Sequence, residues 1–152
     1  MDLQDLGISG PGAAMVCLKD QEKLNSVSQA LKGMGIGTVS QALSQKEALD
    51  KMKYNQYDIV IMEDGFGGSL EDSQLLEEFR NMSISERRSI FLALLGDRWE
   101  TGNALQAFAL SVNLVMNSRI LDKLKEGLTS AMMRTFRFYK IFNEYRETLG
   151  KV

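Results

Sequence analysis

Acidic side chains follow two apolar segments of the sequence, and they are the groups best suited to chemistry. Asp20 follows the first apolar run, and Glu63 and Asp64 end the strongest one. A Mg²⁺ site requires oxygen ligands and several negative charges, which carboxylates grouped in this way could supply. Lys19 adjoins Asp20, however, so its ammonium group would repel a bound Mg²⁺. Repulsion between like unit charges ~4 Å apart is about 4 kcal/mol at an effective dielectric constant of about 20. We therefore expect Lys19 to pair with Glu63 or Asp20 in place of a metal, with a weak Mg²⁺ site at Asp20 and Glu63 as the alternative.

The residue types that the chain lacks exclude several classes of protein. It contains no histidine and a single cysteine, Cys17. Histidine-based catalytic triads, imidazole metal sites, multi-cysteine zinc sites and an internal disulfide are therefore ruled out. The glycine-rich loop 65–68 lacks the spacings of dinucleotide-binding and P-loop motifs. The 18 Lys and Arg residues against 20 Asp and Glu residues give a net charge of −2. This slightly acidic balance does not predict a nucleic-acid-binding protein, which normally carries a strongly basic surface.

Short apolar segments alternate with helix-sized amphipathic segments along most of the chain. Five repeats of strand and helix predict a doubly wound parallel sheet with helices on both faces, because right-handed crossovers permit little else. Five strands in a chain of this length favour the flavodoxin-like α/β order 2-1-3-4-5, with the functional site at the carboxyl ends of the strands. Asp20 is expected to cap the first helix, and Ser44 with Glu47 forms a capping box for the second. The segments predicted to be strands are 13–18, 38–43, 57–62, 90–95 and 112–116.

The chain divides into an N-terminal lead, a globular domain and a C-terminal helical extension, which comprise residues 1–12, 13–127 and 128–152. The lead has no basic segment before a long apolar run and so lacks the pattern of a signal peptide. No apolar stretch of the chain approaches the about 20 residues of a membrane span. We expect a cytoplasmic protein without a membrane-spanning segment.

The segment Tyr57-Asp58-Ile59-Val60-Ile61-Met62-Glu63, together with the order and spacing of the elements, carries a family resemblance. Over residues 13–127 the chain resembles the CheY-like receiver domain of two-component response regulators. The resemblance implies a flavodoxin-like fold. It also implies a site in which an acidic pair after the first strand and an Asp after the third hold Mg²⁺. A Ser or Thr after the fourth strand and a Lys after the fifth would bind the phosphoryl group accepted by that Asp.

Most of those site positions carry other residue types here. The acidic pair falls on Lys19 and Asp20, the phosphoacceptor on Glu63, the Ser/Thr position on Leu95 and the Lys position on Asn117. Only Asp20 keeps the residue type that the resemblance requires. We therefore interpret the chain as a degenerate pseudo-receiver that is not an enzyme, needs no cofactor and acts by protein–protein interaction in signal transduction.

Two other functions are compatible with the same sequence. In the first, the chain is an atypical active receiver that is phosphorylated at Glu63 or at Asp64, a displaced phosphoacceptor, with Mg²⁺ bound. In the second, it is a small-ligand-binding flavodoxin-like module, although no Ser/Thr-rich phosphate loop follows the first strand. Within the pseudo-receiver hypothesis, Glu63 acts either as a permanent imitation of a phosphorylated Asp or as a carboxylate held by Lys19.

Two apolar features predict interaction surfaces. The last helix extends from Ser118 to about Leu149, and beyond the residues needed to cover the sheet it continues an apolar stripe at helical spacing. An exposed stripe of this kind marks an interface, and we expect a homodimer through this helix. The alternatives are a different partner, the rest of a longer signalling chain, or packing of the helix on its own domain. A second surface is expected around the fourth helix and fifth strand. The proposed interface residues are Trp99 and Leu114 on that surface and Met132, Phe136, Tyr139 and Phe142 on the stripe.

Overall fold

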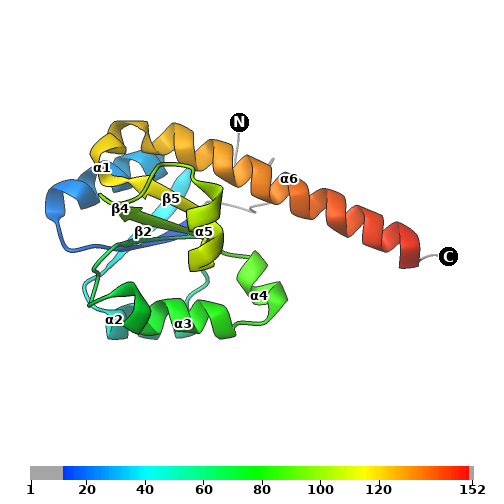
Figure 1. The fold of residues 1–152 in the computed structure, drawn as a ribbon, viewed down its shortest axis with the longest axis horizontal. Coiled ribbons are helices and arrows are strands. Elements are labelled where there is room, and N and C mark those ends of the chain that lie inside the picture. Colours follow the sequence, from blue (N-terminus) through cyan, green and yellow to red (C-terminus); the bar gives the residue numbers. More distant parts are fainter. Residues whose placement is uncertain (1–11, 151–152) are drawn as a thin grey trace.

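The computed structural model describes the backbone of residues 12–150 and the side chains of residues 12–136, 148 and 149. A single sheet of five parallel strands lies at its centre, in the order β2-β1-β3-β4-β5 (Figure 1). This confirms the expected order 2-1-3-4-5. The strands are β1 (Gly12–Cys17), β2 (Ile36–Ala42), β3 (Ile59–Glu63), β4 (Phe91–Gly96) and β5 (Leu114–Asn117).

Helices cover both faces of the sheet (Figure 1). On one face, α1 (Gln21–Gly33) and α6 (Leu124–Gly150) share a hydrophobic core with the strands, and on the other face α2 (Gln45–Tyr54), α3 (Gln74–Asn81) and α5 (Ala104–Leu110) do so. Two 3₁₀ helices, η2 (Leu70–Asp72) and η3 (Ser118–Lys123), and the short helix α4 (Ile84–Arg88) complete the fold. The sequence pattern does not predict α4, because five residues are too few to display a helical period.

Capping side chains determine where the first two helices begin. The side chain of Asp20 accepts hydrogen bonds from the backbone amides of Glu22 and Lys23 and caps α1. Ser44 accepts from the amide of Glu47, whose carboxylate accepts from the amide of Leu43. Both caps confirm the sequence prediction. They matter for the site because α1 starts directly beyond β1, so its first turn lies at the carboxyl edge of the sheet.

The last helix differs from its prediction at the start. Residues 118–123 form the 3₁₀ helix η3, in which Ile120 has a non-helical backbone, and α6 begins only at Leu124. From there α6 packs on the sheet further than expected, because Met132 is fully buried as well as Leu128. The part of α6 that leaves the body therefore starts well beyond residue 128. Figure 1 shows its C-terminal half extending away from the domain.

The structure corrects several of the expected interface residues. Met132 belongs to the core between α6 and the sheet, and Leu114, which is 5% exposed, lies in the same core because β5 is covered by that helix. Phe136 is only partly buried, but its ring packs on Phe91 at a centroid distance of 6.4 Å, so it too packs against the core of the domain. The side chains of Tyr139 and Phe142 lie outside the described residues. In the part of the chain that the structure describes, no helix combines the length and apolar character needed to cross a membrane.

Candidate functional site

The charged residues singled out from the sequence meet at the carboxyl ends of β1 and β3. These two strands are neighbours in the sheet, and the chain leaves them on either side of a shallow depression of about 300 Å³. Such a point, where the strand order reverses, is where open α/β sheets usually place their sites. The charged residues that line the depression are Lys19, Asp20, Lys23, Glu63 and Asp64.

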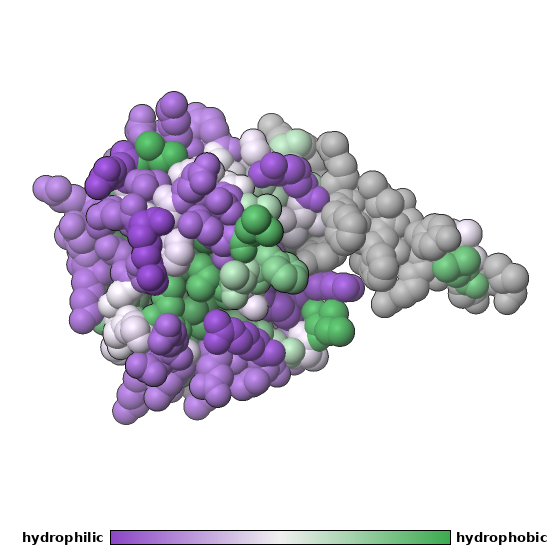
Figure 2. Space-filling view, viewed as in Figure 1, coloured by the Kyte–Doolittle hydropathy of each residue, from purple (hydrophilic) through white to green (hydrophobic). Residues whose placement is uncertain are grey.

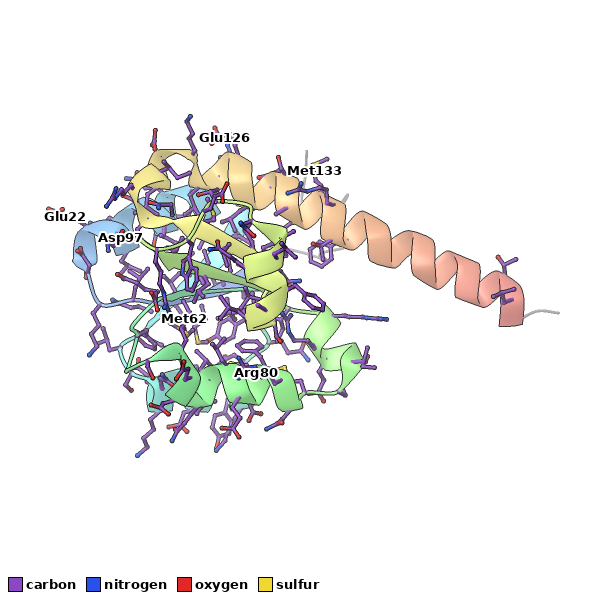
Figure 3. All side chains as sticks on the ribbon, in the orientation of Figure 1. Glu22, Met62, Arg80, Asp97, Glu126 and Met133 are labelled. Atoms are coloured by element: carbon purple, nitrogen blue, oxygen red, sulfur yellow. The ribbon has the colours of Figure 1, made fainter. Side chains whose placement is uncertain are left out.

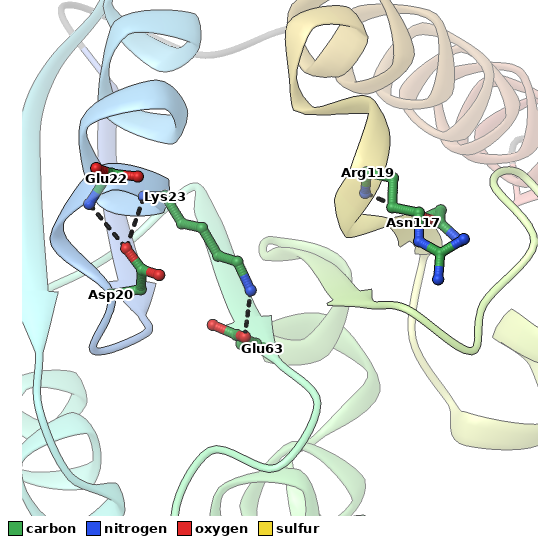
Figure 4. Close-up of polar contacts among 6 residues, drawn as sticks. All are labelled: Asp20, Glu22, Lys23, Glu63, Asn117 and Arg119. Carbon is green, nitrogen blue, oxygen red and sulfur yellow. Dashed lines mark hydrogen bonds and ion pairs between the residues drawn. The ribbon is translucent and has the colours of Figure 1, made fainter.

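An ion pair occupies the centre of this site (Figure 4). Lys23 Nζ lies 2.9 Å from Glu63 Oε1, and the two side chains are 31% and 25% exposed. The hydrogen bond to Glu63 raises the pKa of Lys23 above its ordinary value, so the ammonium form is favoured. The prediction that Lys19 pairs with Glu63 is therefore wrong, because the partner of Glu63 is Lys23. Lys19 precedes the cap of α1 and is exposed, whereas Lys23 lies in the first helical turn and reaches the end of β3.

Asp20 is engaged in holding α1. Its Oδ1 accepts from the amide of Glu22 at 2.9 Å and from that of Lys23 at 3.3 Å (Figure 4). Mg²⁺ requires several oxygen ligands from suitably placed groups. Here one carboxylate serves as a cap and the second is paired with an ammonium group. Among the described residues, no group of three or more acidic, histidine or cysteine side chains could hold a metal ion. Both carboxylates that a magnesium ion would need thus already have partners within the protein.

Asp64 is held by a different cation. Arg98, which follows β4, forms a two-pronged contact with this carboxylate, with Nε 2.7 Å from Oδ2 and Nη2 3.0 Å from Oδ1. The amide of Asp64 donates to the carbonyl of Leu95 at 2.7 Å. The possible displaced phosphoacceptor is therefore already paired with a guanidinium group. Paired, fork-shaped contacts of this type are among the stronger hydrogen-bonded ion pairs.

The end of β4 carries no hydroxyl group toward the site. Leu95 lies opposite Glu63 in the register of β3 and β4, but its side chain is 1% exposed and belongs to the core beneath α1 and α6. Gly96 follows, and the indole of Trp99 packs directly over it. Trp99 is 9% exposed, which corrects its expected role as an exposed anchor: the missing Cβ of Gly96 leaves room for the ring to turn inward.

Asn117 holds the loop that connects β4 to α5. Its Nδ2 donates to the carbonyl oxygens of Asp97 at 3.2 Å and Trp99 at 3.0 Å, and its backbone amide donates to Thr101 Oγ1 at 2.9 Å. Its Oδ1 accepts from the amide of Arg119 (Figure 4). The position that would carry a lysine in the resemblance thus supplies a neutral amide that ties this loop to the end of β5.

Sequence reasoning missed two basic residues of the site, Lys23 and Arg98. Both carry a signal that could have been used. Arg98 stands two residues after the end of β4, and Lys23 stands six residues after the end of β1, three positions after Asp20. The sequence did identify the edge itself, and the structure brings together Lys19, Asp20, Glu63 and Asp64 there, whereas Leu95 faces the core.

Comparison with known proteins identifies the fold. No family model and no curated protein sequence matches the chain. The receiver domain of the Francisella response regulator 1452 matches with a TM-score of 0.62 at 18% identity, over 82% of this chain and 98% of that chain. The chemotaxis response regulator CheY4 of Vibrio cholerae matches with a TM-score of 0.59 at 16% identity, over 80% and 99% of the two chains. A response regulator from Hahella chejuensis matches with a TM-score of 0.55 at 15% identity, over 85% of this chain and 92% of that chain.

These likenesses, with the strand order, show that the chain has the fold of CheY-like response-regulator receiver domains. The ion pair of Lys23 and Glu63 lies at the carboxyl edge of the sheet, where open α/β sheets commonly place their sites.

Proposed function

We propose that the chain is a cytoplasmic pseudo-receiver that acts as a protein–protein interaction module in two-component-type signalling, without phosphoryl transfer of its own. The observation that carries the proposal is the ion pair between Lys23 and Glu63. It places a fixed positive charge against the carboxylate at the position that the resemblance assigns to the phosphoacceptor. A permanent cation there does the neutralising that a metal ion would otherwise supply.

The rest of the site supports the same function. A phosphoryl group attached at Glu63 would find no hydroxyl at the end of β4, because the side chain of Leu95 lies in the core. Asn117, where the resemblance requires a cation, is a neutral amide that is bonded to the loop after β4. Asp64, the alternative acceptor, is neutralised by Arg98. A site of this composition has little with which to stabilise charge developing on a transferred phosphoryl group.

The partner surface that we propose lies on α5. Leu105 and Phe108 are 81% and 85% exposed, and a separation of three residues places them on the same helix face. Figure 2 shows apolar residues gathered over α5 in this view. These two residues replace Trp99 and Leu114 as the apolar contacts of the surface around the fourth strand and the following helix. Exposed apolar patches on an otherwise polar domain commonly mark protein interfaces.

We further propose that the chain forms a homodimer through the end of α6. Helix α6 continues past Phe136, which packs against the core, to Gly150, a length of about 20 Å at 1.5 Å per residue. Leu149 near its end is 56% exposed. The amphipathic sequence of this segment supports pairing with a second copy of the helix.

The experiment that tests the absence of phosphoryl chemistry is an amide NMR titration with Mg²⁺ and beryllofluoride, an imitation of the phosphoryl group. We expect no saturable shift at Asp20, Glu63 or Asp64. A matched titration of an active receiver domain under the same conditions confirms that the reagent is competent. Saturable shifts at these three residues would overturn the proposal and support an atypical active receiver.

A further inference from the structure

A second hollow lies at the amino edge of the sheet, opposite the edge that carries the ion pair of Lys23 and Glu63. Its volume is about 600 Å³, twice that of the depression at the carboxyl edge. Its lining residues come from two segments, 52–60 and 82–90, which lead from the end of α2 into β3 and from the end of α3 to the start of β4. Pockets for small molecules commonly have volumes of ~300–1,000 Å³. The hollow therefore has the size of a ligand site, and we call it the amino-edge pocket.

The inner part of the amino-edge pocket is apolar and contains aromatic and sulfur groups. Val60 is fully buried and Tyr57 is 7% exposed. Around them lie Met52, Met82 and Ile90, which are partly buried and pack on the core shared by α2 and α3. Methionine sulfur makes favourable contacts with aromatic rings, and the face of a tyrosine ring attracts cations. This lining suits a ligand that has an apolar, aromatic body.

Two polar side chains of the pocket use their donors inside the protein and keep an acceptor. Asn55 Nδ2 donates to the carbonyl oxygen of Lys51 at 3.0 Å, and Ser89 Oγ donates to that of Glu86 at 2.6 Å. The amide oxygen of Asn55 and the hydroxyl oxygen of Ser89 remain able to accept hydrogen bonds. These two residues therefore favour a ligand that donates hydrogen bonds.

Asp58 adds a carboxylate to the wall of the pocket. Its Oδ2 accepts from the amide of Ala13 at 2.9 Å, and the side chain is only partly exposed. Among the described residues, neither Asp58 nor Glu86 forms an ion pair. The charged side chains of the lining are these two carboxylates and the ammonium group of the exposed Lys53, so negative charge is in excess. A carboxylate that is partly shielded from water attracts a cation more strongly than one in bulk water.

We propose that the amino-edge pocket binds a small organic cation, an amine or guanidine on an aromatic body. The cationic group is placed at Asp58 and Glu86, and the ring lies among Met52, Tyr57 and Met82. The site lies at the opposite edge of the sheet from the candidate site described above. The proposal therefore does not rest on the absence of phosphoryl transfer or on an interaction through α5.

Two probes of the same shape and opposite charge test the proposal on the wild-type chain. Phenethylamine carries an ammonium group and 3-phenylpropionate carries a carboxylate on the same phenylethyl body. In amide NMR titrations at neutral pH, we expect phenethylamine to cause saturable shifts at Gln56, Tyr57, Asp58 and Met82. The anion should bind at least about tenfold more weakly, because hydrogen bonds between oppositely charged groups are the stronger ones.

Asp58→Asn separates the charge of this residue from its structural contact. The amide oxygen of asparagine can still accept from the amide of Ala13, so the fold is retained while the negative charge is lost. The dissociation constant for phenethylamine should rise about tenfold in this variant, since its charged acceptor is replaced by a neutral one. Glu86→Gln should raise it only about twofold, because Glu86 is exposed and its charge is screened by water.

Glu126→Gln is the matched control. Figure 3 shows Glu126 on α6, on the other side of the sheet from α3, and the residue is exposed. The same change from carboxylate to amide at this position should leave the dissociation constant for phenethylamine at the wild-type value.

The proposal is overturned if phenethylamine causes no saturable shift at the pocket residues, or if 3-phenylpropionate binds as tightly as the amine. It is equally overturned if a folded Asp58→Asn binds the amine as tightly as the wild type. The comparison of the two probes needs no variant, so it decides the proposal even where Asp58→Asn fails to fold. These outcomes are independent of the beryllofluoride titration, which reports on Glu63 and its neighbours at the other edge of the sheet.

Discussion

The ammonium nitrogen of Lys23 lies 2.9 Å from a carboxylate oxygen of Glu63, so the first turn of α1 is tied to the end of β3. Asp20 determines this contact indirectly, because it caps α1 and thereby sets the direction in which the first turn faces. A strand end, a cap and a lysine three residues later are enough to place a cation at the sheet edge. The ion pair of the site is thus formed by residues that lie close in sequence to the ends of two neighbouring strands.

We predict that removing both lysines and shortening Glu63 creates a weak magnesium site. In the variant Lys19→Asp, Lys23→Ala, Glu63→Asp, carboxylates at positions 19, 20 and 63 face the depression without a cation among them. Hard oxygen ligands in this arrangement favour Mg²⁺. An NMR titration with MgCl₂ should show saturable shifts in the variant and none in the wild type.

Lys19→Asp alone is the control for that experiment, because it adds a carboxylate while leaving the ion pair of Lys23 and Glu63 intact. It should remain silent. Binding of Mg²⁺ by this single variant as tight as by the triple variant would show that the ion pair does not exclude the metal.

The contribution of Lys23 to stability is predicted to be lost at high pH. Its pKa is raised in the folded state from an ordinary value of 10.5, chiefly by the hydrogen bond to Glu63. A raised pKa means that the stabilisation is complete below the unfolded-state value and disappears as the pH rises through the folded-state value. The difference in urea unfolding free energy between wild type and Lys23→Gln should therefore be constant from pH 7 to about pH 9 and shrink above about pH 10.5.

The size of this difference should be small. Both side chains are partly exposed, and such pairs contribute up to about 1 kcal/mol. A difference that grows rather than shrinks at alkaline pH would contradict the assigned pairing.

The substitution Gly96→Ala is predicted to destabilise the domain by about 1–3 kcal/mol, because the new methyl group would overlap both the indole of Trp99 and Asp64 Cβ. Gly33→Ala is a suitable control. A Cβ at Gly33 meets only the side chain of Lys125, at an ordinary 3.5 Å, and the residue ends a helix in which alanine is favoured. Urea unfolding should separate the two variants, and equal stability of Gly96→Ala and wild type would show that Trp99 does not rest on Gly96.

The sheet could be predicted from the sequence because its signals are local and repeated. The unbroken apolar residues of β3 and β4 predict strands buried on both faces, and Asp20 and Ser44 mark helix starts. The site edge follows from the same alternation, since parallel strands bring their carboxyl ends together. These features depend on residues that are neighbours in the sequence, which is why they are predicted correctly.

The details of the site could not be predicted because they depend on the direction of individual side chains. Lys19 and Lys23 flank the same cap, and only the turn of α1 decides which one reaches Glu63. The burial of Trp99 depends on a missing Cβ at Gly96, which acts across space. The extension was misjudged for a similar reason: Met132 and Phe136 of its apolar stripe pack on the core of the domain.

Truncation separates the two parts of α6. A chain ending at Phe136 keeps Leu128, Met132 and the contact of Phe136 with Phe91, so we predict that it stays folded with a thermal midpoint close to that of the full chain. A chain ending at Gly127 loses the buried Leu128 and Met132 and should be destabilised by more than about 3 kcal/mol. Light scattering after gel filtration should show a dimer for the full chain and a monomer for the chain ending at Phe136. A dimer that survives this truncation would move the contact from the end of α6 to the body of the domain, where the exposed Leu105 and Phe108 of α5 are the apolar residues available to form it.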